Sequence, residues 1–280
     1  MSTAQTLLLG AIAGGTIFLG LPIGRLRNLS PATRAGLSAL ATGILLFLLW
    51  DVLSGAVEPI EEALGERHWG DFAGMSAVGL IGFALGLMGL VYYAEWMKRQ
   101  SSSRATPLVG PGAAAIDEFE RRGFIHGLTE GQRLSLLIAV GIGVHNFGEG
   151  LAIGQAAATG AASLAVTLII GFALHNATEG FGICGPMSGE GTVPAWGFLA
   201  TLGLIGGAPT FFGTALGQAW TNDTVTVAFF AIAAGSILYV VQELFNVNRK
   251  YGHPVLVMWL VLAGLALGFA TDFVIEASGI

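Results

Sequence analysis

Two polar motifs interrupt long apolar stretches of the chain, HNFGEG at residues 145–150 and HNATEG at residues 175–180. On a helix, His145 and Glu149 lie one turn apart on one face, and Asn146 is adjacent to Glu149 on that face. The second motif repeats this spacing with His175, Asn176 and Glu179. Imidazole nitrogens and carboxylate oxygens together suit borderline divalent metals such as Zn²⁺, Fe²⁺ and Mn²⁺, so we predict a metal site built from both motifs.

The composition indicates the environment of these motifs. Of the 280 residues, 54% are hydrophobic and 11% are charged, and the mean hydropathy is +0.73. Soluble domains are about a quarter charged, so the chain is expected to be an integral membrane protein. A net charge of −6 argues against a nucleic-acid partner. The single cysteine, Cys184, excludes an intramolecular disulfide.

A membrane-spanning helix needs about 20 mostly apolar residues. Eight segments meet this requirement, at roughly residues 4–24, 33–57, 71–97, 131–157, 160–184, 193–219, 223–247 and 254–276. We therefore predict an all-α integral membrane protein with one transporter domain over residues 1–280. The only long connection, at about residues 98–130, is polar and is expected to be a cytoplasmic loop.

Basic residues predict the orientation. With eight spans, eleven of the twelve Lys and Arg residues fall on one side, and only Arg67 falls on the other. The positive-inside rule makes the first side cytoplasmic, which places both termini outside the cell membrane. On the outer side, acidic residues gather around the second connection, where they could attract cations: Glu58, Glu61, Glu62, Glu66 and Asp71.

The first three and last three segments resemble one another. Residues 10–24 align with 203–217 without gaps, matching glycines at four positions, and residues 41–51 align with 233–243, which places Asp51 opposite Glu243. The third and eighth segments share only GFALG and GLALG. Because the copies are five helices apart, the second is inserted upside down, which predicts an inverted repeat around a central pair of helices, as in many secondary transporters.

Placing a carboxylate inside the membrane is unfavourable in free energy. Each costs about 2.5–3.5 kcal/mol near the bilayer centre, so Glu149, Glu179, Glu243 and Asp51 together cost about 10–14 kcal/mol. No Lys or Arg lies at comparable depth to neutralise them. A bound cation offsets this cost most simply. Mg²⁺ and Ca²⁺ prefer all-oxygen sites, so the histidines favour a transition metal.

Two other functions stay open from the residues alone. A divalent-metal channel would use the same mid-membrane site without alternating access. An intramembrane metallohydrolase would need an activated water. The usual His-Glu-x-x-His motif of metalloproteases is absent, so an enzyme is the least favoured alternative.

The paired motifs resemble the signatures on the fourth and fifth spans of the ZIP (Zrt/Irt-like) metal-ion transporters, most closely those of the bacterial and GufA-like branch. The resemblance covers eight spans, outward termini and the long cytoplasmic loop. It implies uptake of zinc, and often iron, manganese or cadmium. It also implies metal binding by the motif residues, a further position at Gln242 and Glu243 on the exit side, a homodimer, and movement of spans one, four, five and six against the others.

The chain departs from the family pattern in three places. Gly148 and Thr178 stand where many members have proline before the Glu. Span six lacks the carboxylate found in many relatives, and Thr210 is its nearest polar group. The long loop holds only His126 in place of a histidine-rich segment. We therefore expect one strongly held ion, or a second ion held more weakly, with the metal bound by His145, Glu149, His175 and Glu179 and released past Glu243 and Asp51.

Overall fold

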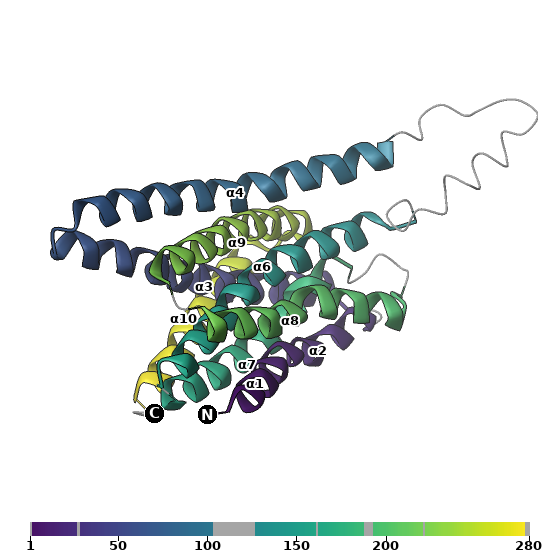
Figure 1. Ribbon diagram of the computed structural model, residues 1–280. Coiled ribbons are helices and arrows are strands. Elements are labelled where there is room, and N and C mark those ends of the chain that lie inside the picture. Colours follow the sequence, from purple (N-terminus) through teal and green to yellow (C-terminus); the bar gives the residue numbers. More distant parts are fainter. Residues whose placement is uncertain are drawn as a thin grey trace, which may run out of the picture.

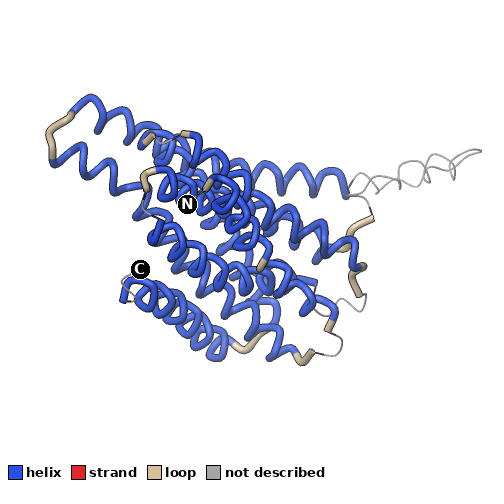
Figure 2. Tube along the Cα trace, turned by 60° about the horizontal axis from the view of Figure 1, so that its bottom comes forward, coloured by secondary structure: helices blue, strands red, loops and turns tan. Residues whose placement is uncertain are grey.

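A computed structural model describes residues 2–26, 29–102, 127–160, 162–187, 193–220 and 222–277. These residues are almost entirely helical and contain no strand (Figure 2). The elements are α1 (Thr3–Gly15), α2 (Ile17–Gly20), η1 (Leu21–Arg25), α3 (Pro31–Gly65), α4 (Trp69–Ser102), α6 (Glu130–Ala158), α7 (Ala162–Cys184), η2 (Gly185–Met187), α8 (Trp196–Ala219), α9 (Asp223–Tyr251) and α10 (Pro254–Ala277).

Among the described residues, seven helices are long and apolar enough to cross a membrane; α7, with 23 residues, is not one of the seven. Large apolar side chains project outward from these helices, including Leu80 at 73% exposure and Leu19 at 72%. Such a surface is stable only in contact with hydrocarbon. The chain is therefore a membrane protein. Figure 1 shows α1 beginning and α10 ending at the same end of the bundle, which is also the end where α3 meets α4.

Capping residues in the sequence mark the first residues of three long helices. Ser30 caps α3 and is followed by Pro31 at the first helical position. Thr129 and Gln132 form a capping box at the start of α6, and Asn222 caps α9. These caps fix the first turns of α3, α6 and α9.

Helix α3 is longer at its C-terminal end than the predicted segment, which stopped at residue 57. It runs to Gly65, with Pro59 inside it, because the segment after the proline is rich in Glu, Ala and Leu, which are strong helix formers. Glu58 and Glu61 consequently lie on the outer turns of a helix. At the opposite end of the bundle, α4 ends at Ser102. Most of the expected loop at 98–130, including His126, lies outside the described residues.

The helices form two groups by their contacts. The site group contains α1, α2, α6, α7 and α8, with α6 packed along α8 (Figure 1). The α9 group contains α3, α4, α9 and α10, with α3 packed on α9 and α10 and α4 packed on α9. Within each group, glycines bring backbones together. A side-chain carbon at Gly213 of α8 would overlap the carbonyl of Phe147 in α6, and one at Gly235 of α9 would overlap the carbonyl of Phe83 in α4.

The largest contact between the groups joins α6 to α9, which run antiparallel. Here side chains intervene: Gly148 of α6 faces the ring of Phe230. A polar pair joins the two helices at each end. Gln155 Nε2 donates to Thr226 Oγ1 at 2.8 Å near one end, and Lys250 Nζ lies 3.0 Å from Glu130 Oε1 at the other. The two groups therefore meet through side chains, whereas each group is held together by backbone contact.

Candidate metal centre

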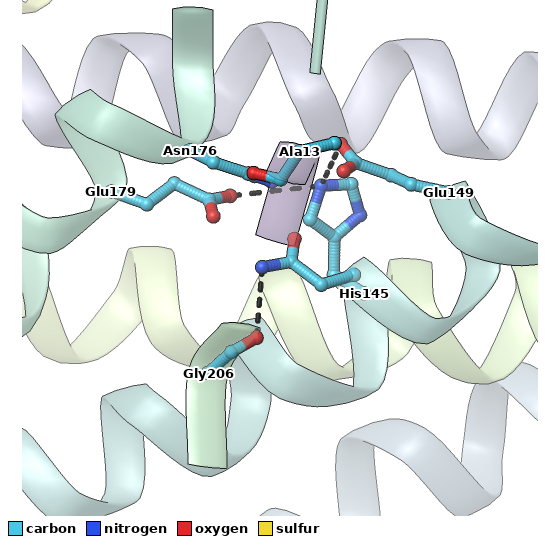
Figure 3. Close-up of polar contacts among 7 residues, drawn as sticks. Ala13, His145, Glu149, Asn176, Glu179 and Gly206 are labelled. Atoms are coloured by element: carbon cyan, nitrogen blue, oxygen red, sulfur yellow. Dashed lines mark hydrogen bonds and ion pairs between the residues drawn. The ribbon is translucent and has the colours of Figure 1, made fainter. Parts of the chain in front are cut away.

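Helices α6 and α7 bring the two motifs together inside the site group. His145 Nε2 lies 3.0 Å from Glu149 Oε1 on its own helix and 3.6 Å from Glu179 Oε1 on α7. All three side chains are at most 3% exposed. Figure 3 shows the side chains of Glu149 and Glu179 reaching the same ring nitrogen of His145. The predicted convergence of a histidine and both glutamates at one depth is thus present.

The spacing of these atoms suits a small divalent ion. Ligand atoms about 2.0–2.2 Å from a tetrahedral ion lie roughly 3.3 Å from one another. The two nitrogen–oxygen distances, 3.0 and 3.6 Å, fall on either side of that separation. Within the part of the chain that the structure describes, however, no group of three or more His, Cys, Asp or Glu side chains is arranged so that it could hold a metal ion. An ion would require the carboxylates to turn toward a common centre.

The two asparagines attach the motifs to the neighbouring helices. Asn146 Nδ2 donates to the carbonyl of Gly206 in α8 at 2.9 Å, and Asn176 Nδ2 donates to the carbonyl of Ala13 in α1 at 3.2 Å. Both residues are completely buried. Their Oδ1 atoms have no hydrogen-bond partner among the described residues, so each amide keeps an oxygen available for a cation.

Three further residues were expected near the two motifs: His175, Thr210 and Gly148. His175 belongs to α7, one residue before Asn176, but its side chain lies outside the described part of the chain. Thr210 is completely buried in α8 close to Gly14. Helix α6 continues through Gly148 without interruption, so glycine in place of proline leaves the helix whole there.

A comparison with protein families connects this geometry to a known group. The model of the ZIP zinc transporter family matches residues 123–276, a segment that contains α6 to α9, all but the last residue of α10, and both motifs. This chain belongs to the ZIP family. No curated relative matches the chain at a significant level. As a ZIP member, the protein is a divalent-metal transporter, and members of this family are transporters rather than enzymes.

In this ZIP transporter, one cavity reaches the candidate metal centre; we call it the acidic cavity. It has a volume of about 670 Å³, and Glu149 forms part of its wall. Four further carboxylates line it: Asp51, Glu58, Glu61 and Asp272. Sequence analysis did not single out Asp272. The same cost argument applied to the other carboxylates would have found it, because Asp272 lies inside the last apolar segment, whereas Glu276 stands at the end of that segment.

A second cavity of the ZIP transporter, also about 670 Å³, lies around Glu243. Glu95 and Glu130 share its wall with three basic residues, Lys98, Arg133 and Lys250. Gln242, next to Glu243, is exposed and is not part of this wall. The structure therefore separates Asp51 from Glu243, which we had expected on one exit path. Asp51 shares a cavity with Glu149, whereas Glu243 lies in the cavity with the basic residues.

Proposed function

We propose that this ZIP member imports a divalent transition-metal ion, zinc first and iron, manganese or cadmium as alternatives, by alternating access through the centre of α6 and α7. The observation that carries the proposal is the buried imidazole of His145, whose Nε2 atom lies near the carboxylates of both Glu149 and Glu179. Among the described side chains of the site, this one imidazole supplies at most one positive charge against two carboxylates. A divalent cation balances this excess in a medium where charge is expensive.

The proposed ligands are the nitrogen of His145 and the carboxylates of Glu149 and Glu179, joined by the side chain of His175. The Oδ1 atoms of Asn146 and Asn176 are further donors, because their amide groups are held by carbonyls of α8 and α1. Nitrogen and oxygen donors of this kind suit Zn²⁺, and they accept Fe²⁺, Mn²⁺ or Cd²⁺ as well.

We propose that the ion enters through the cavity of Asp51 and Asp272 and leaves through the cavity of Glu243. Three basic residues, Lys98, Arg133 and Lys250, line the second cavity, whereas none lines the first, and this supports a cytoplasmic position for the second. This orientation places both termini outside the cell membrane, with α7 as the eighth span in addition to the seven that qualify by length and composition.

The acidic cavity leads to a prediction about affinity. Changing Asp51 and Asp272 together to Asn should raise the KM for zinc uptake severalfold at low ionic strength while leaving the maximal rate nearly unchanged, because the two carboxylates attract the ion without holding it. High salt should shrink the difference from wild type by screening. Initial uptake rates over a range of zinc concentrations, at two salt concentrations, measure both effects. A salt-independent loss of maximal rate would contradict this role.

An inverted repeat is part of the proposal. Ala13 and Gly206 occupy equivalent positions in the alignment of residues 10–24 with 203–217, and they accept the hydrogen bonds of Asn176 and Asn146, respectively. Gly14 and Gly207 are also equivalent, and each would overlap the other's carbonyl if it carried a side chain. Reciprocal contacts of this kind support a two-fold relation between the halves.

The division into a site group and the α9 group supports the movement that the family resemblance implies, in which spans one, four, five and six move against the rest. Backbone contacts hold each group together, and side chains separate them. We propose a homodimer on the same resemblance.

Zinc uptake into vesicles containing the purified protein tests the function. Wild type should show saturable uptake, and His145→Ala should lose nearly all of it, because the central nitrogen ligand is removed. His68→Ala is the matched control, since His68 is exposed at the α3–α4 connection, and it should transport normally. Flux that rises linearly with zinc would favour a channel. Zinc binding without uptake would overturn the transport proposal for this site.

A further inference from the structure

A third cavity lies on the other side of α6 from the acidic cavity and is open to the molecular surface. Its volume is about 430 Å³, and every residue that lines it is apolar or glycine. Seven side chains define its walls: Val140, Val144 and Phe147 of α6, Ile205 and Pro209 of α8, and Phe229 and Ile232 of α9. We call this cavity the lateral groove.

The depth of the lateral groove determines what can reach it. Val144 is at the middle of α6, and Ile205 and Pro209 are near the middle of α8, so the groove faces the hydrocarbon region of the bilayer and not the headgroups. A wall without a charged or hydrogen-bonding side chain complements an uncharged hydrocarbon and disfavours an ion or a polar peptide. Acyl chains are the apolar molecules that a bilayer supplies at this depth.

The walls of the groove come from both helix groups. On one side, Gly143 brings α6 against the carbonyl of Ile205, so α6 and α8 meet there as backbones. Because residue 209 is proline, that carbonyl lacks its usual donor within the helix. On the other side, α9 reaches α6 through side chains, with the rings of Phe147 and Phe229 4.8 Å apart. The groove thus continues the side-chain interface between the two groups out to the lipid.

We propose that the lateral groove binds an acyl chain of a membrane lipid, which lies between α8 and α9 against Val140, Val144 and Phe147 of α6. The acyl chain fills a gap that the protein's own side chains leave open, and it supplies the dispersion contacts that this gap would otherwise lack along all three helices. The ligand is recognised by its hydrocarbon part alone, so we expect little dependence on the headgroup.

Helix α6 provides a clear readout, because it is the most enclosed of the seven qualifying helices. In its apolar window 78% of residues are buried, against 22% in α4. A reactive group on a lipid tail can therefore label α4 widely, but it reaches residues 140–147 of α6 only from within the groove. The experiment uses vesicles of phosphatidylcholine that contain a fraction of the same lipid with a photoreactive diazirine halfway along one tail. After irradiation, labelled peptides are mapped by mass spectrometry.

We expect labels on residues 140–147 of wild type and a severalfold loss of them in Val144→Trp, which fills the groove. Leu204→Trp is the matched control, because Leu204 is 59% exposed and does not line the groove; its α6 should label like wild type. Ile232→Trp fills the groove from α9 and replaces Val144→Trp if that variant fails to fold. A diazirine in the headgroup should leave α6 unlabelled. Labelled α4 with unlabelled α6 in wild type, or equal α6 labelling after groove filling, would overturn the proposal.

Discussion

Changing Glu149 and Glu179 together to Gln should abolish zinc uptake while making the metal-free protein more stable. Uptake should fall about 100-fold or more, because both carboxylate ligands are lost and the amides that replace them carry no charge. The free energy of unfolding without metal should rise by about 1–3 kcal/mol, because two charges are removed from a buried site. Uptake assays and thermal unfolding in detergent with a chelator measure the two quantities.

A loss of uptake together with a gain in stability distinguishes a transport site from a structural one. If the carboxylates held α6 to α7 through His145, the same change would weaken the fold and the unfolding temperature would drop. Glu62→Gln is the control, since Glu62 is exposed on the last turns of α3 and lies outside the acidic cavity wall. It should alter neither uptake nor stability. Adding zinc should stabilise wild type and leave the double variant unchanged.

Placing one methyl group on Gly213 should destabilise the site group severely. The new carbon of Gly213→Ala would overlap the carbonyl oxygen of Phe147 in α6, and a backbone atom cannot rotate away as a side chain can. Helix α8 must then separate from α6, at a cost of about 3 kcal/mol. Because Asn146 is tied to Gly206 of α8, the separation should also disturb the metal centre and lower uptake. Unfolding in detergent and uptake together test this expectation.

Gly89→Ala provides the comparison. Gly89 lies inside α4, and a side-chain carbon there meets no atom within 4 Å. Alanine should therefore stabilise α4 by about 0.5–1 kcal/mol through its higher helix propensity. Equal stability of Gly213→Ala and wild type would show that α6 and α8 are less closely packed than the structure has them.

Much of the helical framework could be predicted from the sequence, because apolar length and capping residues are local signals. Each of the eight predicted segments coincides for most of its length with helix, and the boundaries of α6 differ from the predicted 131–157 by one residue at each end. The stacking of His145 on Glu149 follows from helical periodicity alone. The number of membrane spans stays a prediction, because seven of the described helices qualify by length and composition and α7 is not among them.

The relations between distant segments could not be predicted. The attachment of Asn146 to Gly206 and of Asn176 to Ala13 depends on which helices pack side by side, and no local pattern encodes that choice. The same applies to Asp272, which joins Asp51 only because α10 packs on α3. The separation of Asp51 from Glu243 has the same origin: both lie in the C-terminal half of their helix, but α3 and α9 run antiparallel, with Thr42 of α3 hydrogen-bonded to Asn248 of α9.

The enclosure of α6 also affects how the sequences of an enclosed helix, such as α6, and of a lipid-facing helix, such as α4, can diverge among relatives. Around its circumference, α6 meets a carboxylate of α7, the backbone of α8 and the side chains of α9, so a replacement on almost any turn alters a contact with another segment. Inherited changes in α6 are therefore tolerated mainly when a neighbour changes with them. Helix α4, with most of its surface against lipid, can exchange one apolar residue for another almost independently. Covariation should consequently concentrate on α6 and its neighbours, while α4 preserves little beyond its hydrophobicity and the glycines that face α9.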